Sequence, residues 1–243
     1  MAVDMNSVGA LAISLLVAGL VAFPLARSLR THAWAFYLGA FAVVGVYSWA
    51  VVSGVNLNNY RMLTFVLQKG YLASVLLAIV MFTGCLDNGS ALKRRWRPIR
   101  GELSVLSFIF ILGHLVVFLP SYVQRLLGGS VLKPQVVASI VVALILTAVF
   151  VVLGVTSFKA VRRSMNARVW KAIQRFAYLM VVLYIVHVGF FLGTSALGGS
   201  HKGLASLVVY CVAVGAYAVL RIRKAVRDHR GEEAPLEAAP LAV

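Results

Sequence analysis

The hydrophobic positions of this sequence fall in long runs that polar residues rarely interrupt. A hydrocarbon core of about 30 Å requires roughly 20 mainly apolar residues in one helical crossing, and seven runs approach this length. None of them alternates polar and apolar residues as a barrel strand does. The pattern therefore predicts an all-α, polytopic transmembrane bundle of about seven spans, at residues 9–26, 34–52, 63–84, 103–121, 136–157, 173–192 and 204–220.

The composition supports the same class of protein. Hydrophobic residues make up 61% of the 243 positions and charged residues 12%, and the mean hydropathy is +0.93. A soluble domain needs more polar surface than this to cover its core. We therefore expect an integral membrane protein.

The basic residues are concentrated at alternate ends of the predicted spans. Eighteen of the 23 Lys and Arg residues follow the first, third, fifth and seventh spans; the other five are Arg61, Lys69, Arg125, Lys133 and Lys202. Because cytoplasmic loops carry the excess of positive charge, the N-terminus is predicted outside and the C-terminus in the cytoplasm, in a bacterial plasma membrane. The net charge of +16 reflects this bias and contact with anionic membrane lipid, so no nucleic-acid partner is expected.

Two histidines lie deep inside apolar spans, His114 in the fourth and His187 in the sixth. At 1.5 Å per helical residue, His114 is about 21 Å beyond Arg100 and His187 about 18 Å beyond Arg175. Both helices run in the same direction, so the imidazoles are predicted at one level in the outer half of the membrane. Such a pair could hold a haem, with one imidazole on each face of the iron. The alternative is that each ring hydrogen-bonds a neighbouring helix.

The neighbours of the two histidines suit a flat macrocycle. Gly113 and Gly189 lie within two residues of the histidines and are expected to leave room for the ring. Large apolar side chains four residues before and after each histidine share its helical face and would flank it: Phe110, Phe118, Leu183 and Phe191.

Two segments carry a family resemblance. The first is KRRWRPIRGELSVLSFIFILGHLVVF (93–118), a basic loop leading into the span with His114; the second is TSFKAVRRSMNARVWKAIQRFAYLMVVLYIVHVGFFLG (156–193), which contains Trp170, Tyr178 and His187. Across residues 69–193 the chain resembles the ferric reductase-like transmembrane domain family, and within it MsrQ-type haem-binding membrane subunits. The resemblance implies a b-type cytochrome in which His114 and His187 are the axial ligands of the haem iron.

The resemblance also divides the chain and sets the number of haems. It implies N-terminal transmembrane helices outside the match at 1–62, the haem-binding domain at 63–193 and a last helix with its basic end at 194–230. The Ala, Pro and Glu content of residues 231–243 predicts a disordered tail. Family members commonly carry a second, inner histidine on each of the two ligand helices. Here Gln174 stands at that level on the sixth span and Arg100 or Gly101 on the fourth. These are not ordinary haem ligands, so one haem b per chain is expected.

Weaker signals mark both ends of the expected haem site. Lys69 could pair with the haem propionates or extend to the membrane interface, and Gly70 could let the ring edge approach. His201, in a short outer loop, is expected to be solvated. At the inner end, a second cofactor, FMN or a quinone, could be held by Trp170, Gln174 and Tyr178.

The sequence has no Gly-rich dinucleotide fingerprint and no phosphate loop. The chain is therefore expected to be the electron-transfer subunit of an oxidoreductase rather than a complete enzyme. It would take electrons from a cytoplasmic flavoprotein, a bound flavin or a quinol, and deliver them to an acceptor reductase on the outer face. Two alternatives stay open: a haem-free transporter or channel, disfavoured by the scarcity of acidic residues in the spans, and a membrane anchor subunit of a redox complex.

Overall fold

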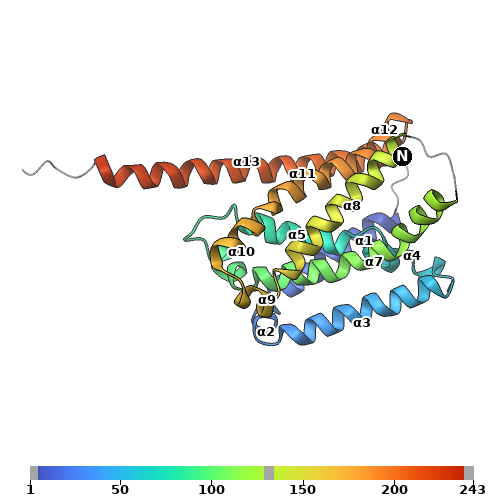
Figure 1. Ribbon diagram of the computed structural model, residues 1–243, viewed down its shortest axis with the longest axis horizontal. Helices are drawn as coiled ribbons and strands as arrows, with labels where there is room; N and C mark the ends of the chain where they lie inside the picture. The colour runs from blue at the N-terminus through green and yellow to red at the C-terminus, as the bar shows by residue number, and fades with distance from the viewer. Residues whose placement is uncertain (1–4, 129–133, 238–243) are drawn as a thin grey trace, which may run out of the picture.

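The computed structural model describes residues 5–128 and 134–237, and this part of the chain is built from helices (Figure 1). Seven helical segments in it are long and apolar enough to cross a membrane, which confirms the predicted all-α transmembrane bundle. In chain order the crossings are α1 (Met5–Ala22), α3 (Ala33–Val52), α4 (Arg61–Gln68) with α5 (Tyr71–Thr83), α7 (Arg100–Leu127), α8 (Pro134–Val155), α10 (Ala167–Gln174) with α11 (Phe176–Val188), and α13 (His201–Glu237).

Short helices connect the crossings: α2 (Ala26–Thr31), η1 (Asn58–Tyr60), α6 (Ala91–Trp96), η2 (Arg97–Ile99), α9 (Lys159–Ser164) and α12 (Thr194–Leu197). The first crossing ends at Ala22, earlier than predicted, because Pro24 cannot continue the helical hydrogen bonding. Helix α13 continues to Glu237, whereas the tail was expected to be disordered from Gly231. The Glu and Ala residues of this segment are strong helix formers. Residues 238–243 and the predicted outer Lys133 lie outside the described residues.

The third crossing is broken in its N-terminal half, although the sequence pattern predicts a single helix there. Helix α4 ends at Gln68, and α5 begins at Tyr71 after Gly70, whose φ of +66° is left-handed. A glycine adopts this conformation without steric cost. A helix end leaves main-chain carbonyls without helical partners, so the break exposes hydrogen-bond acceptors inside the bundle.

The bundle has two groups of helices joined by α8. Helices α1, α3, α4, α5 and α7 pack on one another, α8 packs against both α7 and α11, and α13 packs against α11 and α12. The main core lies in the first group, where Leu29, Leu76, Ile99, Leu103 and Ile109 are fully buried. Helices α1 and α3, from the part of the chain assigned outside the family resemblance, contribute to this core. Helices α7 and α11 make no extensive contact with each other.

Four segments with many basic residues meet at one end of the bundle, which we call the basic end (residues 23–30, 84–102, 156–175 and 221–230). Arg95 donates to the Phe23 carbonyl at 2.8 Å. Lys159 forms an ion pair with the buried Glu102 at 2.7 Å, and Arg221 joins α13 to the α5–α6 loop. Helix α13 projects past its neighbours at this end (Figure 1). The basic residues that the sequence places at alternate ends of the spans thus lie at one end of the structure.

Candidate functional site

His114 is held by the broken third crossing. It lies on α7, and its Nδ1 is 2.7 Å from the main-chain oxygen of Gln68 at the end of α4. A carbonyl only accepts, so Nδ1 carries the proton and donates it. The Nε2 of the neutral ring then keeps its lone pair, and it makes no hydrogen bond with any described residue. The ring is therefore oriented by the protein with one nitrogen left available for a ligand.

Gly70 allows α5 to approach this histidine closely. A Cβ at Gly70 would lie 3.1 Å from Cδ1 of Ile111 and 3.8 Å from the Cβ of His114. Together with the positive φ, this contact explains why a glycine stands in the break. Gly70, which was predicted to let the edge of the haem approach, therefore lies next to His114.

His187 lies on α11, immediately before an unusual turn. Residues Gly189–Gly193 form a π-helical turn, a distortion that occurs frequently at functional sites. The Nδ1 of His187 is buried and has no hydrogen-bond partner within the described chain, although the main chain of Ser139 on α8 lies beside it. An unsatisfied buried polar atom costs about 1–3 kcal/mol. The ring thus has unused coordinating capacity in the interior of the bundle.

The two histidines lie on helices that both pack against α8. The ring of Phe118 lies 4.7 Å from that of His114, and the ring of Phe191 lies 5.2 Å from that of His187, between centroids. Tyr122 on α7 also contacts Phe191, at 6.2 Å. One aromatic ring therefore lies against each imidazole, from the residue four positions later, whereas contacts of Phe110 and Leu183 with the histidines are not seen in the described residues.

The two glycines beside the histidines differ in their surroundings. A Cβ at Gly113 would lie 3.1 Å from Leu67 Cβ and 3.5 Å from Tyr47 Cδ1, whereas no atom lies within 4 Å of a Cβ at Gly189. The expectation that Gly113 leaves room for a macrocycle is wrong, because α4 and α3 fill that space. The space beside Gly189 is free.

The outer end of the site contains Lys69 and a pocket. Lys69 donates to Ser7 of α1 and lies over the ring of Phe65, 4.0 Å from its centroid. It therefore ties α1 to α4. A pocket of about 420 Å³ lies between α3, η1, α4 and α7, and its lining includes Arg61, Gln68 and Val117. Gln68 thus borders this pocket and also holds His114. His201 is exposed at the start of α13.

The predicted inner residues belong to two separate contacts. Trp170 Nε1 donates to the Thr156 carbonyl at 3.0 Å, and the Gln174 amide donates to Thr156 Oγ1 at 3.1 Å. Tyr178 instead accepts from Nη2 of Arg221 at 2.7 Å. Trp170 and Gln174 therefore fasten α10 to the end of α8, whereas Tyr178 fastens α11 to α13.

Some groups that lie next to the histidines cannot be recognised from the sequence. The Gln68 and Ser139 groups near the rings are main-chain atoms, which every residue has. Tyr184, one turn before His187, donates to Ser74 Oγ at 3.1 Å and contacts the ring of Tyr210. Ser74, Tyr184 and Tyr210 are polar side chains within apolar spans. This feature of the sequence could have indicated the link between α5, α11 and α13.

Comparison with known proteins identifies the central segment. Residues 69–185 match the family of the ferric reductase like transmembrane component. Over this segment the chain is similar to ferric reductase-like transmembrane components. His114 lies within the family segment, and His187 lies two residues beyond its end.

A longer relative matches most of the chain. An uncharacterized protein of Treponema pallidum (strain Nichols) is 36% identical over 217 residues, which cover 88% of this chain and 60% of that protein. The chain therefore spans less than two thirds of the length of that relative. No solved structure gives a significant match.

Proposed function

We propose that the chain is a membrane-embedded b-type cytochrome that passes electrons to an acceptor on the outer face. The ferric reductase-like family places it among membrane components of redox systems. The observation that carries the haem proposal is the orientation of His114. Its Nδ1 is bonded to the Gln68 carbonyl at 2.7 Å, so its Nε2 keeps a free lone pair within a bundle of apolar helices.

The residues present fit a haem with two histidine ligands. His114 and His187 would hold the iron, and the free space beside Gly189 would receive part of the ring. When bound, haem supplies one-electron oxidation and reduction, tuned by its axial ligands and their hydrogen bonds. The Gln68 carbonyl would fix the tautomer of His114 and raise its basicity. The nearby phenylalanines would exclude water.

The proposed direction of electron flow follows from the distribution of charge. The basic end is proposed to face the cytoplasm of a bacterial plasma membrane. Electrons would enter there from a flavoprotein, or from FMN or a quinone near Trp170, Gln174 and Tyr178. They would leave at the opposite end, where the haem level is closer to the surface. The resemblance to MsrQ-type subunits supports a reductase as the acceptor.

An absorption spectrum tests this function. The detergent-purified protein is expected to show the bands of a b-type cytochrome after reduction with dithionite. His114→Ala and His187→Ala each remove one axial nitrogen, so each variant should insert in the membrane yet lose or grossly change these bands.

His201→Ala is the matched control, because this histidine is exposed and should leave the spectrum unchanged. A wild-type protein without haem bands, or an unchanged spectrum in either ligand variant, would contradict the proposal.

A further inference from the structure

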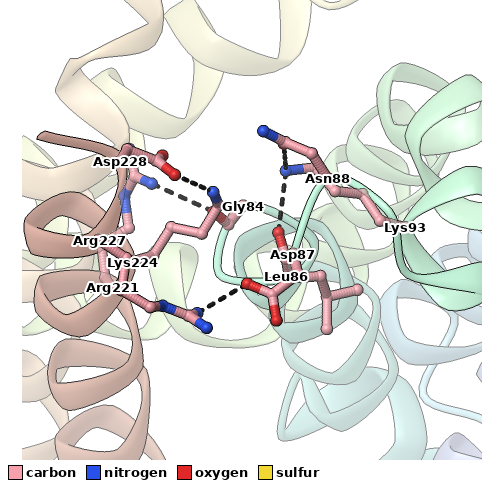
Figure 2. Close-up of polar contacts among 9 residues, drawn as sticks. All are labelled: Gly84, Leu86, Asp87, Asn88, Lys93, Arg221, Lys224, Arg227 and Asp228. Atoms are coloured by element: carbon pink, nitrogen blue, oxygen red, sulfur yellow. Dashed lines mark hydrogen bonds and ion pairs between the residues drawn. The ribbon is translucent and has the colours of Figure 1, made fainter. Parts of the chain in front are cut away.

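A second polar site lies at the basic end, where the α5–α6 loop meets α6 and η2; the other side of this loop contacts α13 (Figure 2). Lys93 Nζ donates to the Leu86 carbonyl at 2.9 Å and to Asn88 Oδ1 at 2.7 Å. Arg94 donates to the Gly89 carbonyl at 2.5 Å. These bonds shape the loop but use only part of the donors, because an ammonium group has three and a guanidinium five.

A pocket of about 270 Å³ lies among these groups, lined by Asn88, Lys93, Arg94, Arg97 and Pro98. Three of its lining residues are cations and none is acidic. At about 30 Å³ for each water molecule, the volume corresponds to roughly nine waters. It is large enough for a phosphate group with an ester substituent.

The acidic side chains nearest to the pocket already have partners. Asp87 of the loop pairs with Arg227 at 2.7 Å, and Asp228 pairs with Lys224 on its own helix. Figure 2 shows both pairs on the side of the loop that faces α13. They cannot neutralise the cations that line the pocket without breaking these contacts.

The lining cations form no ion pair with an acidic side chain of the described residues. Arg97 makes no hydrogen bond or ion pair with any described residue. Lys93 experiences the positive charges of Lys224, Arg97 and Arg221, with Asp228 as the opposing negative charge. A bound anion would relieve this repulsion.

Positive charges also act on the thiol of Cys85. Burial raises the pKa of Cys85, the residue that opens the loop, while positive charges act against this rise. These charges come from three separate segments: Arg221, Arg100 and Lys93. The loop is thus surrounded by cations on more than one side.

We propose that this pocket binds a phosphate group. The pocket lies where the basic ends of the spans would meet the lipid headgroups, and basic pockets at this level of membrane proteins bind anionic headgroups. The headgroup of an anionic phospholipid and a free phosphate compound offer the same chemistry. The phosphate proposal rests on the lining cations and does not depend on the proposed haem. The two arms of the following experiment likewise do not depend on it.

Lipid binding is measured by native mass spectrometry of the full-length protein in detergent. Dioleoylphosphatidylglycerol and dioleoylphosphatidylcholine are titrated separately. Arg97→Gln removes a cation that has no internal bond and should weaken phosphatidylglycerol binding roughly fivefold, since each basic residue near an anionic surface contributes about 1 kcal/mol. R94Q/R97Q should weaken it further. R163Q/R168Q, with the same charge change at exposed positions of the same end, should bind as the wild type does.

The second arm uses inorganic phosphate. Thermal unfolding is followed in phosphate and in chloride at equal ionic strength. Stabilisation by phosphate that disappears in R97Q, without selective phosphatidylglycerol binding, would assign the site to a free phosphate compound. Wild-type lipid binding in R97Q and R94Q/R97Q, together with no effect of phosphate, would overturn the proposal.

Discussion

At the scale of single residues, His114 depends on a neighbour that no side-chain pattern reveals. The sequence places the histidine in an apolar span and predicts its contact with Phe118, because residues four apart share a helical face. Its hydrogen-bond acceptor, however, is the Gln68 carbonyl, which is available only because α4 ends there. The polar Gln68-Lys69-Gly70 sequence within an apolar run was the single hint. The role expected of Gly113 failed for a similar reason, since close packing of α4 is a tertiary property.

Gly70→Ala tests this dependence. A non-glycine residue in the left-handed conformation costs about 1–2 kcal/mol, and the new Cβ would lie 3.1 Å from Ile111. The variant should unfold at lower temperature and show an altered haem spectrum, because the Gln68 carbonyl would shift. Thermal unfolding and the dithionite-reduced spectrum measure the two effects. Gly45→Ala, where no atom lies within 4 Å, should change neither; equal behaviour of the two variants would show that the break does not position His114.

At the scale of helices, hydropathy predicts crossings but not their interruptions. Apolar residues lie on both sides of the break at Gly70 and of the π-helical turn at Gly189–Gly193, so hydropathy still predicts one continuous crossing in each place. The sixth crossing is also divided, between α10 and α11, near Arg175. The break at Gly70 lies beside His114, and the π-helical turn begins two residues after His187. The features that distinguish the ligand helices from ordinary spans therefore come from main-chain geometry.

Gly189→Leu asks whether the free space on α11 belongs to a cofactor. No atom lies within 4 Å of a Cβ at this position, so a larger side chain would begin in open space. If the haem occupies that space, the variant should insert normally but contain much less haem, as measured by absorbance per mole of purified protein. Gly215→Leu, on α13 and equally free of neighbours, is the control. Full haem content in Gly189→Leu would place the macrocycle elsewhere.

At the scale of the whole molecule, the sequence predicts the number of crossings and the gathering of positive charge at one end. It does not predict that α1 and α3 complete the core of the first helix group, because residues that face another helix or lipid are equally apolar. Exposed Trp34 and Trp49 mark opposite ends of α3, as expected of interfacial aromatics. The packing of α8 against both α7 and α11 is likewise a tertiary feature.

The same arrangement predicts a single haem in each chain. At the inner level, Gln174 donates to Thr156 Oγ1, and a Cβ at Gly101 would lie 3.6 Å from the Ser157 carbonyl; these contacts are structural and include no haem ligand. Haem content by the pyridine haemochromogen method should therefore be near one per chain, with one midpoint in a redox titration. Gln174→Ala should keep both values, although losing the hydrogen bond would lower stability by about 1 kcal/mol. A ratio near two, or two separate midpoints that persist in Gln174→Ala, would mean that a second haem binds at the inner level through ligands other than these.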